Sequence, residues 1–191
     1  MEADWEFEVG GGAPAIEAFW PGFVDLRHSP ERIGEIQEAA AFPPLVALLL
    51  ALNGPGSPLW TAKCDLWEPE PDEPAGPAAS APGMVSRAAL ACYIDLLPLV
   101  GRVFAQPQQA EAFCREWVAR LAPVEQPDCR VDLVIRQAIA GQAEGFGVTA
   151  YVSAEGREKP AAAEALAAAL AAFADSIPAC AVPETPASKL Q

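Results

Sequence analysis

Four segments of the chain alternate polar and apolar residues, as strands with one buried and one exposed face do. The apolar positions of these segments are Cys64, Leu66, Cys92, Ile94, Val131, Leu133, Ile135, Val148, Ala150 and Val152. The polar positions are Lys63, Asp65, Tyr93, Asp95, Arg130, Asp132, Arg136, Thr149, Tyr151 and Ser153. The alternation predicts a sheet with one dry face and one charged face that carries tyrosines.

Along the whole chain, the periodicity predicts one order of elements repeated three times: strand, connection, strand, helix. The predicted strand pairs are 5–9 with 16–20, 59–67 with 86–97, and 129–139 with 146–154. The predicted helices cover 30–40 and 43–52, then 107–121, then 160–177. The triplet Gly10-Gly11-Gly12 is interpreted as the hairpin turn of the first pair.

These elements predict an α+β fold of three successive strand-strand-helix units. The units would form a mainly antiparallel sheet with its helices on one face. A ferredoxin-like β-α-β-β-α-β order is nested within the series. We expect one domain over residues 1–178, with a mobile, acidic, Pro-rich loop at 68–83 and a disordered tail at 179–191.

Charge narrows the classes of partner. The formal net charge is −14 and no cluster of Lys or Arg is present, so nucleic acid and anionic membrane surfaces are excluded as expected partners. The longest apolar run, 45–52, is far shorter than the roughly 20 residues that a membrane span needs. The N-terminus is acidic where a signal peptide would be basic, and an Ala- and Pro-rich composition is typical of GC-rich bacterial genomes. We therefore expect a cytoplasmic bacterial protein.

Cysteine and histidine give no sign of a metal centre. The five cysteines include no Cys-x-x-Cys pair, and three of them lie on the apolar side of predicted strands, so we interpret them as reduced, buried thiols. His28 is the one histidine and lies next to a predicted helix start, as a loop or capping residue. We predict no metal and no cofactor.

The candidate site is the polar face of the sheet. The residues assigned to it are Lys63, Asp65, Trp67, Tyr93, Asp95, Asp132, Arg136 and Tyr151. A solvated face with weak cross-strand ion pairs would explain the charges, at about 0.2–1 kcal/mol per pair. It would not explain the rings, because large aromatic side chains on an open polar face are more often covered.

Two function classes follow from this face. The first is a binding or interaction protein without catalysis, whose partner is a polar small molecule or a basic protein. The second is a small acid-base enzyme acting on a polar metabolite, with Asp65 or Asp132 as the base and Lys63 or Arg136 stabilising an anion. A third outcome is a homodimer in which a second copy covers the face.

Overall fold

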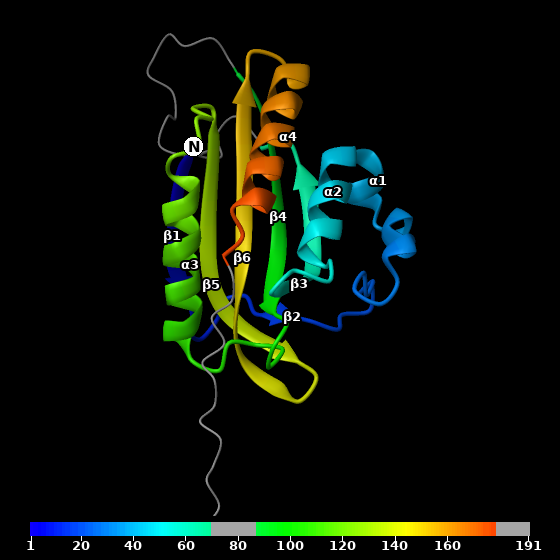
Figure 1. The fold of residues 1–191 in the computed structure, drawn as a ribbon, viewed down its shortest axis with the longest axis vertical. Coiled ribbons are helices and arrows are strands. Elements are labelled where there is room, and N and C mark those ends of the chain that lie inside the picture. The colour runs from blue at the N-terminus through cyan, green and yellow to red at the C-terminus, as the bar shows by residue number, and fades with distance from the viewer. Residues whose placement is uncertain (70–86, 179–191) are drawn as a thin grey trace, which may run out of the picture.

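The computed structural model describes residues 1–69 and 87–178 (Figure 1). The elements follow the chain in the order β1 (Glu2–Glu8), β2 (Ile16–Glu17), a 3₁₀ helix (Pro30–Glu35), α1 (Gln37–Ala41), α2 (Pro43–Leu52), β3 (Leu59–Trp67), β4 (Ala88–Pro98), α3 (Pro107–Leu121), β5 (Cys129–Ala140), β6 (Ala143–Gly156) and α4 (Lys159–Asp175). None of the helices in these two ranges is both long and apolar enough to span a membrane. The predicted mobile loop and disordered tail lie outside the described residues, apart from residues 68 and 69.

The strands form one mixed sheet in the order β1-β5-β6-β4-β3. The pairs β3/β4, β4/β6 and β5/β6 are antiparallel, whereas β1 and the two-residue β2 both run parallel to β5. The predicted α+β class and the mainly antiparallel sheet are confirmed.

The prediction for the first strand pair is wrong. Ala13 N donates to Gly10 O at 3.2 Å, and Gly10 and Gly12 have positive φ angles, so the glycine segment does turn. The turn does not reverse the chain into a hairpin, because β1 and β2 lie one after the other along the same partner strand. The ferredoxin-like nesting is not confirmed either, since β2 pairs with β5 in parallel and β6 separates β5 from β4.

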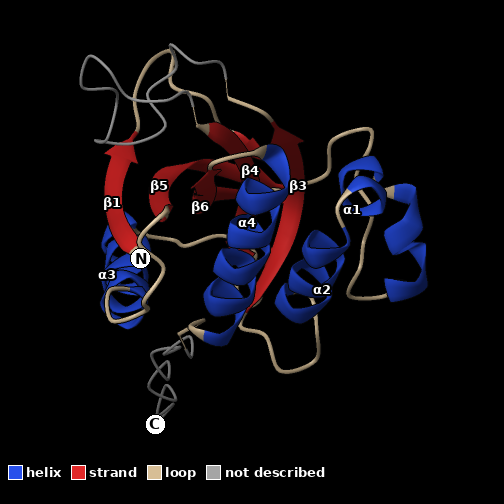
Figure 2. Cartoon of the chain, turned by 90° about the horizontal axis from the view of Figure 1, so that it is seen from above, coloured by secondary structure: helices blue, strands red, loops and turns tan. Residues whose placement is uncertain are grey.

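All helices lie on one side of the sheet (Figure 2). The main core forms between them and the apolar strand positions, which are completely buried on β5 and β6. Cys64 and Leu66 are only half-buried because β3 is an edge strand. Trp117 of α3 stacks on Phe173 of α4, with ring centroids 4.2 Å apart, and joins these two helices. The predicted dry face is therefore the face that carries the helices.

A second, smaller core lies on the opposite face, at one end of the sheet. Ile16 is paired with Ala138, and Trp60 is paired with Leu97, so these residues share the side of the sheet that carries the polar positions. Ala18, Ala62, Val103 and Ala140 complete this core, and the segment 14–20 covers it together with Phe23. The polar face thus has a roof at one end, and the candidate site lies at the edge of that roof.

Candidate functional site

A pocket of about 440 Å³ opens between the polar face of the sheet and the segment 14–20. Four strands and the roof contribute its walls, which are formed by Pro14, Ala15, Ile16, Glu17, Trp20, Lys63, Tyr93, Asp95, Arg136 and Tyr151. Five of the eight residues predicted for the site therefore meet in one concavity: Lys63, Tyr93, Asp95, Arg136 and Tyr151.

Strand register explains why these side chains meet. Tyr93 of β4 lies opposite Tyr151 of β6, and Asp95 lies opposite Thr149 in the next row toward the roof. Strand β3 contains one extra residue between Thr61 and Cys64, and such a bulge redirects the side chains around it.

The roof is attached at this bulge. The indole Nε1 of Trp20 donates to the carbonyl oxygen of Ala62 at 2.9 Å, and Ala62 lies within the irregular part of β3. Trp20 therefore connects the segment 14–20 to the edge of the sheet, directly beside Lys63.

A chain of hydrogen bonds runs through the floor of the pocket. The completely buried Thr149 donates its hydroxyl to Asp95 Oδ1 at 2.6 Å and accepts from Arg136 Nη1 at 3.3 Å. Arg136 donates to Glu8 Oε2 through Nε at 2.9 Å and also through Nη2. The guanidinium carbon lies 5.5 Å from the centroid of the Tyr151 ring. Each of the three nitrogens of Arg136 thus donates one hydrogen bond to Glu8 or Thr149.

Burial and contacts with neighbouring groups shift the pKa values of Asp95 and Arg136 in opposite directions. Burial raises the pKa of Asp95 above its usual value, and the Thr149 hydroxyl and the Arg136 charge offset this rise only in part. For Arg136 the balance is the reverse. Burial alone would lower the pKa of Arg136, but its contacts with Glu8 and Tyr151 outweigh burial, so that the pKa of Arg136 is raised. Arg136 stays charged near neutral pH, while Asp95 is a desolvated carboxylate.

Lys63 is the cation at the other side of the pocket. Its Nζ lies 5.8 Å from the centroid of the Tyr93 ring and 5.7 Å from that of Trp20. Contact with the Tyr93 hydroxyl is the main cause that raises the pKa of Lys63, whereas burial is the main cause that raises the pKa of Tyr93. Within 1–69 and 87–178, no carboxylate forms an ion pair with Lys63.

Trp67 lies next to the pocket and packs on both of its tyrosines. The ring centroids are 6.2 Å apart for Trp67 and Tyr93, 6.4 Å for Trp67 and Tyr151, and 5.9 Å for the two tyrosines. The three rings are half-buried and cover one another across β3, β4 and β6. Trp67 therefore supports the tyrosines from outside the pocket.

Asp65 and Asp132, the two predicted bases, flank the tyrosines in one row across the strands. Register runs from Asp65 through Tyr93 and Tyr151 to Asp132. Asp132 receives two hydrogen bonds from Arg130, both at 2.6 Å. Asp65 is exposed, accepts from Leu66 N at 2.8 Å, and lines a neighbouring hollow of about 380 Å³ with Glu35 and Glu38. Neither carboxylate is part of the wall of the pocket that holds Asp95.

Periodicity missed two parts of the site. Trp20 and Glu17 belong to the roof, whose residues follow no alternation that assigns them to a face. Periodicity assigns Thr149 to the polar face but not to the site, because a lone hydroxyl between apolar neighbours has no feature that links it to Asp95. Pro14 and Pro21 mark an irregular segment but do not indicate where it folds.

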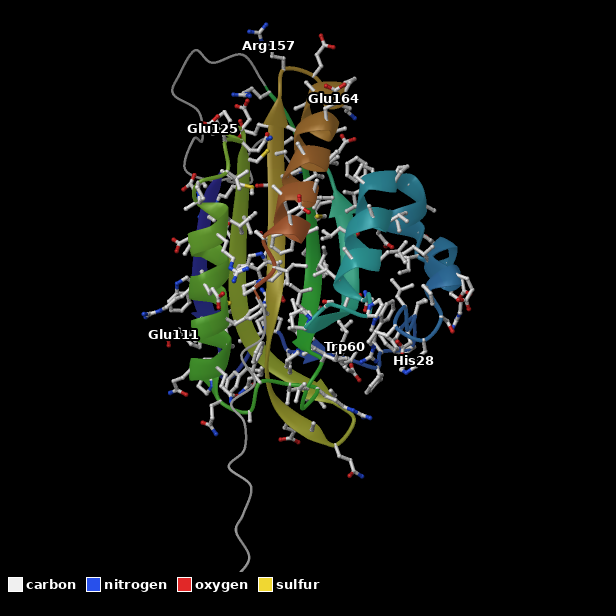
Figure 3. The ribbon with its side chains drawn as sticks, viewed as in Figure 1. His28, Trp60, Glu111, Glu125, Arg157 and Glu164 are labelled. Carbon is white, nitrogen blue, oxygen red and sulfur yellow. The ribbon has the colours of Figure 1, made fainter. Side chains whose placement is uncertain are left out.

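The four cysteines within the described residues and the histidine lie outside the pocket. Burial raises the pKa of Cys64, Cys92 and Cys114 to about 12, which makes these thiols poor nucleophiles at neutral pH. His28 is exposed in a peripheral loop, where its Nδ1 lies 2.9 Å from Asp25 Oδ2 (Figure 3).

No group of three or more His, Cys, Asp or Glu residues suited to a metal ion occurs in the part of the chain that the structure describes. Comparisons with protein families, with curated proteins and with solved structures found no match for this chain.

Proposed function

We propose that this chain binds a small polar molecule in the pocket between the polar face of the sheet and the segment 14–20, and that it does so without catalysing a reaction. The observation that supports this is the convergence of Lys63, Tyr93, Asp95, Arg136 and Tyr151 from four strands on one concavity of about 440 Å³. That volume lies within the range of small-molecule sites, about 300–1,000 Å³.

The burial of the floor favours a binding pocket over a solvated face. A solvated face has ion pairs of the kind that Arg130 and Asp132 form, which contribute little to stability. In the pocket, by contrast, Asp95 is desolvated and its hydroxyl partner Thr149 is completely buried. Desolvating a carboxylate is costly, and a ligand that pairs with it would offset that cost.

The acid-base enzyme is the weaker candidate, since it depends on Asp65 or Asp132, and neither lines the pocket.

A basic protein partner is favoured by one observation. Strand β1 adds three exposed acidic residues, Glu2, Asp4 and Glu6, to the open part of the polar face. Composition further supports a cytoplasmic bacterial protein.

A ligand screen with a matched pair of variants tests the proposal. The full chain is screened against a library of polar metabolites by ligand-observed NMR, and each hit is repeated with Ala15→Trp and Ala105→Trp. Ala15 lines the pocket and is exposed, so an indole there obstructs the pocket without entering a core. Ala105 is an exposed residue away from it. We expect Ala15→Trp to abolish binding and Ala105→Trp to leave it unchanged.

Two results would contradict the proposal. One is a library without hits on the wild-type chain. The other is a set of hits that Ala15→Trp and Ala105→Trp leave equally intact, since the ligands would then bind elsewhere. Size-exclusion chromatography of the wild-type chain reports whether a second copy covers the face instead.

A further inference from the structure

We propose that the ligand of this pocket is a small zwitterion, with its anionic group held by Lys63 and its ammonium group held by Asp95. The inference rests on the proposed function and adds the chemical class of the ligand. It follows from which charged groups of the pocket remain available after the contacts within the protein are counted.

The charge of Arg136 is already paired within the protein, with Glu8. Its Nε and Nη2 donate to Glu8, its Nη1 donates to Thr149, and its guanidinium lies over the ring of Tyr151. A ligand carboxylate that took over the N–H groups bound to Glu8 would exchange one carboxylate for another without gain.

Lys63 and Asp95 are the two charges on the sheet side of the pocket with unused capacity. Glu17 adds a carboxylate on the roof side, but it is exposed, whereas Asp95 is half-buried in the floor. Lys63 has three N–H donors, contacts aromatic side chains, and forms no ion pair with any described carboxylate. Asp95 accepts one hydrogen bond through Oδ1, from Thr149, and no described residue donates to its Oδ2. One positive and one negative group of the sheet therefore face the pocket without an ion-pair partner among the described residues.

The two groups are close enough to serve a single small ligand. They lie on β3 and β4, which are neighbours in the sheet, and neighbouring strands are about 4.8 Å apart. Lys63 Nζ does not approach Asp95 within ion-pair distance, since it lies against Trp20 and Tyr93 instead. A molecule with opposite charges separated by a few bonds can pair with both groups at once.

The uncharged walls fit the rest of such a molecule. The rings of Trp20, Tyr93 and Tyr151 surround the two charges and offer apolar surface to a short carbon chain. Aromatic faces also attract an ammonium group. A ligand with only one charge would pair with Lys63 or with Asp95 but not with both, and Asp95, the more buried of the two, would lose most by staying unpaired.

Calorimetric titration of the full chain tests the charge requirement. The probes are glycine, β-alanine and γ-aminobutyrate, which separate the same two charges by increasing lengths, with acetate and ethylamine as the single-charge halves. Ionic strength is held constant, because exposed charges respond to salt. We expect at least one zwitterion to bind about tenfold or more tightly than either half, the loss expected when one charged contact is missing.

Two variants remove one charge each from the pocket. Lys63→Gln and Asp95→Asn are each expected to lower the affinity for the preferred zwitterion about tenfold or more. In each variant the zwitterion should then bind no more tightly than one of the two single-charge compounds. Lys159→Gln and Glu6→Gln make the same changes at exposed positions outside the pocket and should leave affinity unchanged.

The outcomes separate this inference from the proposed function. The zwitterion proposal is wrong if acetate binds as tightly as every zwitterion and Asp95→Asn leaves these affinities unchanged. It is also wrong if only uncharged library compounds bind at the site that Ala15→Trp blocks. In both cases the proposal of a binding pocket remains. If no probe and no library compound binds, both proposals fail.

Discussion

Thr149→Val removes the hydroxyl at the centre of the pocket floor and keeps the shape of the side chain. Thr149 is completely buried between β4 and β5, where it donates to Asp95 Oδ1 at 2.6 Å and accepts from Arg136 Nη1 at 3.3 Å. The substitution therefore deprives a desolvated carboxylate of a short hydrogen bond without creating a large cavity.

The expected loss of stability follows from these two bonds. A hydrogen bond to a charged group contributes about 1.5–3 kcal/mol, and a buried acceptor left without its donor loses most of that amount. The long bond from Arg136 adds little, because Arg136 keeps its contacts with Glu8. We expect Thr149→Val to lower the free energy of unfolding by about 2–3 kcal/mol at neutral pH.

The loss should depend on pH with a defined sign. Because the pKa of Asp95 is raised in the folded protein, the ionised form disfavours folding, and this penalty disappears as pH falls through the raised pKa. Thr149→Val removes a bond that stabilises the ionised form, so the pKa rises further. The difference in stability between wild type and variant should therefore shrink as pH is lowered.

Urea denaturation followed by tryptophan fluorescence measures these differences, at neutral pH and at successively lower pH. Thr149→Ser keeps the hydroxyl and serves as the control, with a smaller loss from the missing methyl group. In a chain that already carries Asp95→Asn, Thr149→Val should lower the free energy of unfolding by less than it does in the wild-type chain. Equal losses for Thr149→Val and Thr149→Ser, or a loss that grows toward acid pH, would refute the reasoning.

Three further substitutions test other parts of the structure. Trp117→Ala removes a ring that is stacked on Phe173 and bonded to Ser176, and should cost about 3–5 kcal/mol of unfolding free energy in urea; a cost below about 1 kcal/mol would contradict the packing. Gly147→Ala places a Cβ 2.8 Å from Ile16 Cδ1 and 3.0 Å from Leu96 O, and should lower the melting temperature, whereas Gly34→Ala, with nothing within 4 Å, should not. Burial opposes ionisation of Asp25, but contacts with Arg27 and His28 outweigh burial and lower the pKa of Asp25 to about 2. Asp25→Asn should therefore reduce stability above pH about 4, and the difference from wild type should vanish as pH falls toward about 2. A loss of stability that is independent of pH would contradict the ion pairs.

The two faces of the sheet were predictable because helices cover only one of them. Side chains of a strand alternate between faces, so a one-sided core imposes a period of two on Val131, Leu133 and Ile135, and the structure buries all three. β1 follows the same rule, with Trp5 on the helix side and its acidic residues on the other.

Strand order was not predictable from periodicity, because alternation reports which face a residue takes and not which strand lies beside it. The parallel pairing of β1 and β2 with β5 depends on contacts more than a hundred residues apart in sequence. The wrong hairpin at Gly10–Gly12 has the same origin, since three glycines allow a reversal without requiring one.

The site was predictable as a set of residues on one face, but not in its choice of carboxylate. Asp65, Asp95 and Asp132 share the polar face, and Asp95 differs from the other two in its distance from the roof. Asp95 lies one row nearer the segment 14–20 than the other two, and therefore it alone is desolvated beside Lys63. The roof is fixed by Ile16, Ala18 and Trp20, whose contacts with the sheet no local pattern indicates.

The most direct test of a ligand pocket is a two-dimensional ¹H–¹⁵N NMR titration of the full chain with the tightest compound from the screen. The account predicts that the amide shifts which change upon binding cluster at the roof segment 14–20 and at Lys63, Tyr93, Asp95, Thr149 and Tyr151. Changes confined to the open acidic part of the face around Asp4 and Asp132, or spread over the helices, would contradict it.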